Sequence, residues 1–325
     1  MIRPILLLAS LALVGCTVVP TVPSAGGTTA PERADRVVAL VGHVGAMSLV
    51  TADPGGSLRP LDEAGLPPDA AWLSSSGGLL LATTLAGRIV LGATGPGIGS
   101  AGSRGGIAWS PALGDLGGNH PERAFGSLEP AAVPAAGGRP TTRRVAFVEG
   151  DPGSGAAARL IVETLAGTEV RPIDLPRAAE SAPAWLPDGR IVIVVRDQAD
   201  RPMALLADPA SGRLASTGPG MLRSVAIGGA AVATIGADGI VRIGPITTWL
   251  GGQPGEPVTG IGVDEPILQA QPSAEGDELA LVVADPAGDA ASIRILAGTG
   301  GWHETARFGL PPGANRAVVG WLVAP

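Results

Sequence analysis

Residues 181–195 have the sequence SAPAWLPDGRIVIVV, and they contain the clearest strand and turn signals of the chain. The apolar run Ile191–Val195 predicts a strand. The preceding Pro187-Asp188-Gly189 predicts a hairpin turn, because Pro presets the first turn position and Gly accepts a positive φ. Two further apolar segments follow, Met203–Ala207 and Arg213–Ser216, separated by turn residues. Residues 181–217 therefore predict four short strands joined by tight turns.

Weaker copies of this pattern occur on both sides of it. They fall at residues 71–91, 130–162, 224–243 and 271–296. The first strands of all the copies, including those near 184 and 320, are spaced roughly 40 to 60 residues apart. A repeat of that length with four short strands indicates a β-propeller.

The two ends of the repeat region predict how the ring closes. The last apolar run, Val318–Val323, leaves no room for three further strands. The first folded segment, 36–61, supplies three strands at 37–41, 47–51 and 58–61 but none of the Trp-containing type. Joining the two completes one blade. We therefore expect an all-β, six-bladed propeller over residues 36–325, closed by N- and C-terminal strands in one blade.

The stretch Pro183–Gly189 resembles the TolB-type or WD40-like propeller repeat, in which Pro-x-Trp-Ser-Pro-Asp-Gly precedes an apolar strand. The match is close at 183–195 and looser in the other copies, and the repeat pattern covers about 290 residues. The resemblance implies a six-bladed ring that binds partners or ligands, and by itself it implies no enzyme.

Composition agrees with a turn-rich β protein. The 325 residues include 50 Gly and 31 Pro, yet 45% are hydrophobic and 16% are charged, so the chain can bury a large core. All 22 basic residues are Arg, which excludes Schiff-base lysine chemistry and a Walker A loop. The net charge of −7 and the 3% of aromatic residues offer no footprint for nucleic acid.

The N-terminus resembles a bacterial lipoprotein signal. Arg3 precedes the apolar run Ile5–Val14, which has the length of a signal-peptide core, and Gly15 precedes Cys16. Cys16 is the sole cysteine, so it cannot form an intramolecular disulfide. The resemblance implies a signal peptide at 1–15, lipidation of Cys16 and a flexible tether at 16–35. We expect acyl chains such as palmitate to hold the chain on the extracytoplasmic side of the cell membrane.

The residues that carry metal or hydrolytic chemistry do not form known motifs. His43, His120 and His303 fall in separate predicted blades, without metal-ligand spacing. The Gly-Ser-Gly-like stretches at 99–102 and 153–155 lack the nucleophile-elbow pattern. The sequence thus predicts no catalytic residue, no metal and no cofactor.

Acidic residues are expected at turns. Asp-Pro pairs at 53–54, 151–152, 208–209 and 285–286 follow apolar strands, and they predict Asp-capped turns. The alternative is a ring of carboxylates that holds Ca²⁺, with Asp285 and Asp289 as the most suggestive pair. The acidic clusters at 62–63, 264–265 and 275–278 are expected to be solvated turn tips. Asn119 and Asn315, the two asparagines, are expected in loops, which makes a lactonase-type channel difficult to build.

The stretches 92–106 and 113–127 are the least repeat-like, and insertions in repeat folds often form the binding face. We therefore expect a monomeric, lipid-anchored binding or scaffolding module with a protein or envelope partner. Two alternatives stay open. One is a propeller hydrolase or lactonase with a metal in the central channel, and the other is an accessory lipoprotein of a sensor or secretion system.

Overall fold

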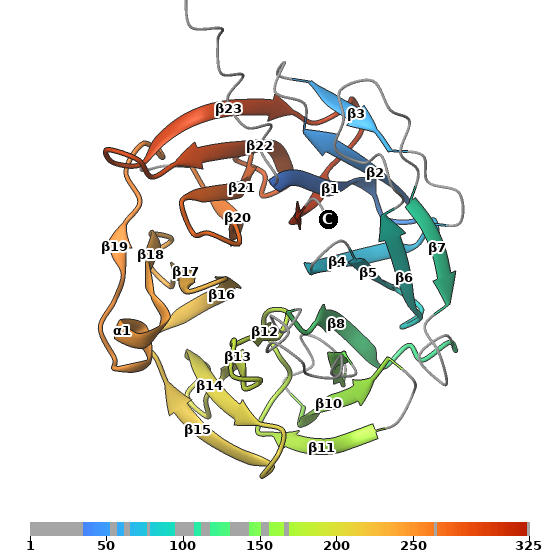
Figure 1. The fold of residues 1–325 in the computed structure, drawn as a ribbon, viewed down its shortest axis with the longest axis vertical. Coiled ribbons are helices and arrows are strands. Elements are labelled where there is room, and N and C mark those ends of the chain that lie inside the picture. Colours follow the sequence, from blue (N-terminus) through green and yellow to red (C-terminus); the bar gives the residue numbers. More distant parts are fainter. Residues whose placement is uncertain are drawn as a thin grey trace, which may run out of the picture. The chain divides into compact units, whose positions relative to one another are not determined.

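The computed structural model confirms a six-bladed β-propeller (Figure 1). The chain divides at Arg33/Ala34, and the structure describes only residues of the second unit. The described residues are 35–52, 57–61, 66–76, 79–94, 107–111, 118–130, 143–150, 156–165, 169–262 and 265–323. Cys16, the signal peptide and the tether up to residue 34 lie outside them, whereas Asp35, the last residue of the predicted tether, begins the first strand. No described helix is long and apolar enough to cross a membrane.

Each blade is a four-stranded antiparallel sheet, and successive blades follow the colour sequence around the ring in Figure 1. From the channel outward, blade 1 contains β24 (Arg316–Val323), β1 (Asp35–His43), β2 (Ala46–Ala52) and β3 (Leu58–Pro60). Blade 2 contains β4 (Ala70–Ser76), β5 (Leu79–Thr84), β6 (Ile89–Thr94) and β7 (Ile107–Pro111). Blade 3 contains β8 (Arg123–Leu128), β9 (Arg144–Glu149), β10 (Ala158–Thr164) and β11 (Glu169–Leu175).

The second half of the ring repeats this order. Blade 4 contains β12 (Ala184–Trp185), β13 (Ile191–Arg196), β14 (Pro202–Asp208) and β15 (Arg213–Thr217). Blade 5 contains β16 (Leu222–Gly228), β17 (Ala231–Gly236), β18 (Val241–Pro245), the helix α1 (Ile246–Leu250) and β19 (Glu256–Pro257). Blade 6 contains β20 (Ile267–Pro272), β21 (Glu278–Ala284), β22 (Ala290–Ala297) and β23 (His303–Gly309).

The predicted closure is confirmed. Strand β24 pairs antiparallel with β1, from Arg316 opposite Gly42 to Val323 opposite Asp35. The last strand of the chain is therefore the innermost strand of the first blade. This hydrogen-bonded pairing joins the two ends of the described chain in one sheet and thereby closes the ring.

The core is divided among the contacts between neighbouring blades. Six buried apolar clusters each join two adjacent sheets, and together they go once around the ring. The second strand of each blade is packed on both sides; Ile191–Val195 of β13, for example, is fully buried. This explains why these strands are continuous apolar runs rather than alternating ones.

One strand was predicted at the wrong place. We expected the first strand of blade 3 near residue 131, whereas the inner strand is β8, Arg123–Leu128. Pro130 and Pro134 cannot donate to a ladder, which disfavours a strand there. In β8 the regular alternation of side chains along a strand is interrupted, because Phe125 has a φ of 57° and the pairing to β9 skips two residues. The stretch 113–127, expected to be an insertion, therefore contains part of the blade.

Candidate functional site: the central channel and its proximal face

The inner strands of the six blades line a central cavity of about 430 Å³. Every inner strand follows a connection from the preceding blade, so all six begin at the same end of the channel. The turns between the second and third strands of each blade lie at this end too; the backbone N–H of Ala237 in one such turn donates to the carbonyl of Met221, just before β16 (3.0 Å). We call this end the proximal face and the opposite end the distal face.

Inner strands bulge where they begin at the proximal face. Pairing to the second strand skips Ala71 in β4, Phe125 and Gly126 in β8, Arg223 in β16 and Leu268 in β20. In blade 4 residues 180–183 separate the isolated bridge of Ala179 with Val195 from β12. A bulge redirects side chains, and Phe125, Arg223 and Leu268 all line the cavity.

The bulge at Phe125 is a strained position. A φ of 57° is rare for a bulky residue and costs about 1–3 kcal/mol. The next residue has to be glycine, because a Cβ at Gly126 would collide with the Thr83 hydroxyl of blade 2. That hydroxyl accepts a hydrogen bond from the Gly126 N–H (3.1 Å). Contacts with the neighbouring blade thus hold the unfavourable conformation in place.

The strain places two aromatic rings together at the channel. Phe125 meets Trp72 edge to face, with ring centroids 5.2 Å apart and planes at 66°. Both rings line the cavity and are half-buried. Trp72 is not equivalent to the repeat tryptophan Trp185, although it lies near the beginning of the weaker repeat copy at 71–91. It pairs with Thr83 near the beginning of β4, whereas Trp185 is the last residue of β12.

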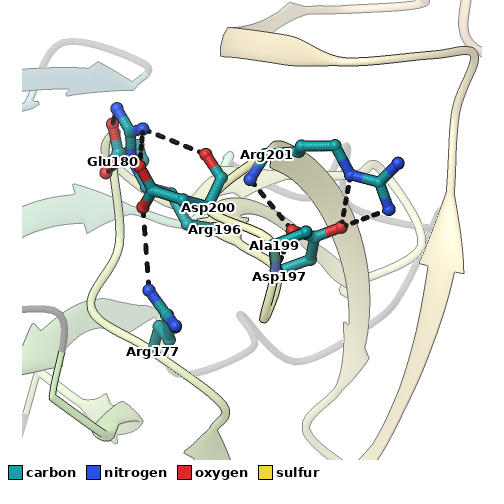
Figure 2. Close-up of polar contacts among 7 residues, drawn as sticks. All are labelled: Arg177, Glu180, Arg196, Asp197, Ala199, Asp200 and Arg201. Carbon is teal, nitrogen blue, oxygen red and sulfur yellow. Dashed lines mark hydrogen bonds and ion pairs between the residues drawn. The ribbon is translucent and has the colours of Figure 1, made fainter.

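The described lining of the cavity includes two charged residues, Glu180 and Arg223. Glu180 is held by the Arg196 guanidinium, whose Nε and Nη2 donate to its two oxygens at 2.8 and 3.2 Å (Figure 2). Arg196 also donates to the Asp200 carboxylate (3.1 Å), and Arg177 lies 3.6 Å from that carboxylate. The loop carrying Glu180 is therefore fixed to the turn after β13.

A neighbouring ion pair strengthens the same turn. Asp197 accepts from the Nε and Nη2 of Arg201 at 2.9 and 2.8 Å and from the backbone N–H of Ala199 at 2.8 Å (Figure 2). These bonds, led by the backbone N–H of Arg201, lower the pKa of Asp197 below its usual range. The turn thus keeps its charges paired at neutral pH.

Arg223 differs from these arginines. Its side chain is exposed, and it forms no ion pair with any residue that the structure describes. The only described cavity-lining carboxylate, that of Glu180, is already engaged by Arg196. The guanidinium of Arg223 is thus available to a ligand in the channel.

The proximal face also carries the apolar surface. Five large hydrophobic side chains are exposed in the described part of the chain, and all five lie at this face: Val44, Leu85, Met221, Ile240 and Leu268. Leu268 belongs to a bulge, and the other four lie in turns or loops between strands. In the described part of the chain, the large exposed hydrophobic side chains are thus confined to one end of the propeller.

Side chains hold the inner strands together deeper in the channel. The indole of Trp185 donates to the Ser127 carbonyl of blade 3 (3.2 Å), and that of Trp321 donates to the Gln271 carbonyl of blade 6 (2.9 Å). The Gln269 amide exchanges two hydrogen bonds with the backbone of Val319, at 2.9 and 3.0 Å. These bonds make the channel wall rigid, so its shape is preset before any ligand arrives.

The histidines are dispersed, as predicted. His43 ends β1, His120 lies 3.2 Å from Glu122 before β8, and His303 begins β23. Among the described residues no three His, Cys, Asp or Glu side chains gather as metal ligands. Asn119 and Asn315 lie in loops, as expected.

The Asp-Pro turns that the structure describes are Asp-capped. Asp208 accepts from the Ala210 N–H (2.9 Å) and the Ser211 hydroxyl (2.6 Å), and the hydroxyl bond is the main cause of its lowered pKa. Asp285 accepts from the backbone N–H groups of Ala287 (2.8 Å) and Asp289 (3.1 Å), which confirms a turn there. The pairs at 53–54 and 151–152 lie outside the described residues.

Two acidic residues expected at solvated tips have structural contacts instead. Glu278 is buried at the beginning of β21, where its N–H donates to the Ser273 hydroxyl (3.2 Å). Glu265 accepts two hydrogen bonds from the buried guanidinium of Arg294, and this lowers the pKa of Glu265. The cluster at 62–63, Asp264, the Gly-Ser stretches at 99–102 and 153–155 and most of 92–106 lie outside the described residues.

Sequence reasoning missed the residues of the channel mouth: Trp72, Phe125, Arg223 and Leu268. A local signal exists in two of the strands. Buried residues are three positions apart at the beginning of β16 (Leu222 and Val225) and of β20 (Ile267 and Ala270), instead of the two that a regular strand requires.

Comparison with solved structures places the fold. TolB from Acinetobacter baumannii aligns with a TM-score of 0.55 at 14% identity, over 89% of this chain and 66% of that one. A structure from Agrobacterium tumefaciens with a provisional TolB assignment aligns with a TM-score of 0.50 at 12% identity, over 90% and 98%.

The chain has a TolB-like propeller fold. A Bacteroides uniformis protein provisionally assigned as a 6-phosphogluconolactonase aligns with a TM-score of 0.45 at 14% identity, over 86% of this chain and 85% of that one. No family model and no curated protein matches the sequence. At these identities the likeness establishes the TolB-like fold alone. The chain spans less than two thirds of the Acinetobacter TolB.

Proposed function

We propose that the chain is a lipid-anchored, extracytoplasmic binding protein whose TolB-like propeller docks a protein partner on its proximal face. The observation that carries the proposal is the one-sided apolar surface. The large exposed hydrophobic side chains of the described residues all lie at this end, around a channel mouth with two aromatic rings. Aromatic and apolar side chains inside a polar rim are typical of protein interfaces.

The rim of this face is preorganised. The ion pairs of Arg196 with Glu180 and of Arg201 with Asp197 fix one proximal turn and the loop beside it (Figure 2). A preset surface loses little conformational freedom when a partner binds, which favours affinity. The anchor rests on Cys16, which follows an apolar run of signal-peptide length. A membrane-anchored scaffold and an accessory lipoprotein of a sensor or secretion system both fit this proposal.

The experiment compares two pairs of substitutions with the same added charge. In the first variant, Met221→Glu and Ile240→Glu charge the proximal face; both side chains are exposed and lie outside the cavity lining. In the control variant, Ala210→Glu and Thr299→Glu place the same charges in exposed distal turns. Each tagged full chain is cross-linked in intact cells, and the captured proteins are identified by mass.

We expect a partner that the wild type and the distal variant capture and the proximal variant loses. Burying one uncompensated carboxylate in an apolar interface costs several kcal/mol, so two should reduce capture by more than tenfold. Equal capture by the two variants, or loss in the distal variant alone, would contradict the assignment of the proximal face.

A further inference from the structure

The central cavity has the size and lining of a small-molecule site. Its volume of about 430 Å³ falls within the range of about 300–1,000 Å³ that is common for such sites. The walls are inner β-strands joined by side-chain hydrogen bonds, such as those of Gln269 to Val319. The cavity therefore has a fixed shape, which a surface loop would not provide.

Apolar and aromatic side chains line the wall on two sides, Trp72 and Phe125 from blades 2 and 3 and Leu268 from blade 6. Trp72 and Phe125 form an edge-to-face pair, and Leu268 lines the same cavity with 47% of its surface exposed. Phe125 and Leu268 reach the cavity because bulges redirect them, and Phe125 adopts a φ of 57° to do so. A backbone held in an unfavourable conformation to present an aromatic ring points to a functional role for that ring.

The mouth has one cationic side chain that is not paired with a described carboxylate. Arg223 lines the cavity, is exposed and has no ion-pair partner among the described residues. Glu180, the carboxylate in the described lining, is neutralised by the two hydrogen bonds from Arg196. Arginine presents a planar fork that fits a carboxylate with two parallel hydrogen bonds. A ligand that fits this mouth thus combines an anionic group with an apolar body.

We propose that the channel binds a carboxylate with an apolar, ring-bearing body, with the carboxylate on Arg223 and the body against Trp72, Phe125 and Leu268. Two kinds of ligand carry these groups: a free small carboxylic acid, and the carboxyl terminus of a peptide whose last residue is aromatic. The site shares Leu268 and the two aromatic rings with the docking surface proposed above. Met221 and Ile240 do not line the cavity, so substitutions there test docking without changing the channel site.

The experiment titrates the purified full chain, in nanodiscs of zwitterionic lipid, with defined probes by calorimetry; empty nanodiscs are the blank. The small-molecule probes are 4-phenylbutyrate and its neutral amide. The peptide probes are N-acetyl-Gly-Phe with a free carboxyl terminus and the same peptide amidated. We expect at least one acid to bind at least tenfold more tightly than its amide, and the stronger acid identifies the source.

Variants separate the charge from the apolar wall. Arg223→Gln should weaken the acid at least tenfold and leave the amide unchanged, whereas Phe125→Ala should weaken both. Arg213→Gln, at an exposed arginine of β15 outside the cavity, is the control and should bind like the wild type. Circular dichroism checks that each variant is folded.

If neither acid binds at millimolar concentration, or if acid and amide bind the wild type equally, the proposal is wrong. An unchanged affinity in Arg223→Gln overturns it as well. The partner-capture experiment does not involve these probes, so failure of the channel proposal leaves the docking proposal testable, and the reverse also holds.

Discussion

Replacing Trp185 with phenylalanine tests whether the repeat tryptophan holds two blades together. The Trp185 side chain is 3% exposed, and its indole N–H donates to the Ser127 carbonyl of blade 3 at 3.2 Å. The Arg144 guanidinium lies over the ring, 4.9 Å from its centroid, and is itself held by Glu129. One side chain therefore makes a hydrogen bond, a cation–π contact and apolar packing across the boundary between blades 3 and 4.

The cost can be estimated from these contacts. Phenylalanine leaves a buried carbonyl without its donor, which costs about 1–3 kcal/mol. The smaller ring loses packing and weakens the contact with Arg144, for about 1 kcal/mol more. We therefore expect the free energy of unfolding to fall by about 2–4 kcal/mol. For a domain of this size each kcal/mol lowers the melting temperature by about 2 °C, so the shift should be about 4–8 °C.

The assay is urea denaturation followed by circular dichroism, with calorimetry for the melting temperature. Trp302→Phe is the matched control, because Trp302 is partly exposed in a distal turn and should lose less than about 1 kcal/mol. A Trp185→Phe variant that is as stable as the wild type, or no less stable than Trp302→Phe, would show that the contacts of Trp185 with blade 3 do not stabilise the fold.

Three further predictions use other parts of the structure. A Cβ at Gly228 would collide with backbone oxygens of the next blade, so Gly228→Ala should lower the free energy of unfolding by about 1–3 kcal/mol in urea denaturation. Gly309 has open space around it, so Gly309→Ala should raise the free energy of unfolding by about 0.5 kcal/mol. Equal effects of the two substitutions would contradict the packing described for Gly228. The hydrogen bonds from Arg294 lower the pKa of Glu265, so this carboxylate stabilises the fold above its ordinary value of about 4.5 and loses that effect as the pH falls through its lower folded value. Glu265→Gln should flatten that part of a stability–pH curve, and an unchanged slope would assign it to other groups. Cys16→Ser should release the chain from the membrane fraction on centrifugation, and retention would refute the lipid anchor.

The ring could be predicted from the sequence, but its channel mouth could not. The strands of residues 181–217 and the closure by Val318–Val323 follow from turn residues and apolar runs, which are local signals. The sequence did not predict that Phe125 and Arg223 line the channel, because a bulge changes the side of the strand that a residue faces. The cause of such a bulge lies in the neighbouring blade. The glycine required at position 126, for instance, is explained by Thr83, 43 residues earlier.

The acidic residues show the same limit. Asp208 and Asp285 cap turns through backbone groups two residues away, so their sequence context was sufficient. Glu265 was expected to be a solvated tip, yet it binds Arg294, which is 29 residues later. Charges that pair within a turn can be read from sequence, whereas charges that pair between strands need the fold.

Site-specific photo-cross-linking can identify the face of the propeller on which a protein partner docks. A photoreactive phenylalanine analogue is placed at Met221 on the proximal face or at Ala210 in the distal turn after β14, in the full chain and in intact cells. We predict a discrete cross-linked partner from position 221 and none from position 210. The same adduct from position 210, or adducts of equal yield from both faces, would contradict the account.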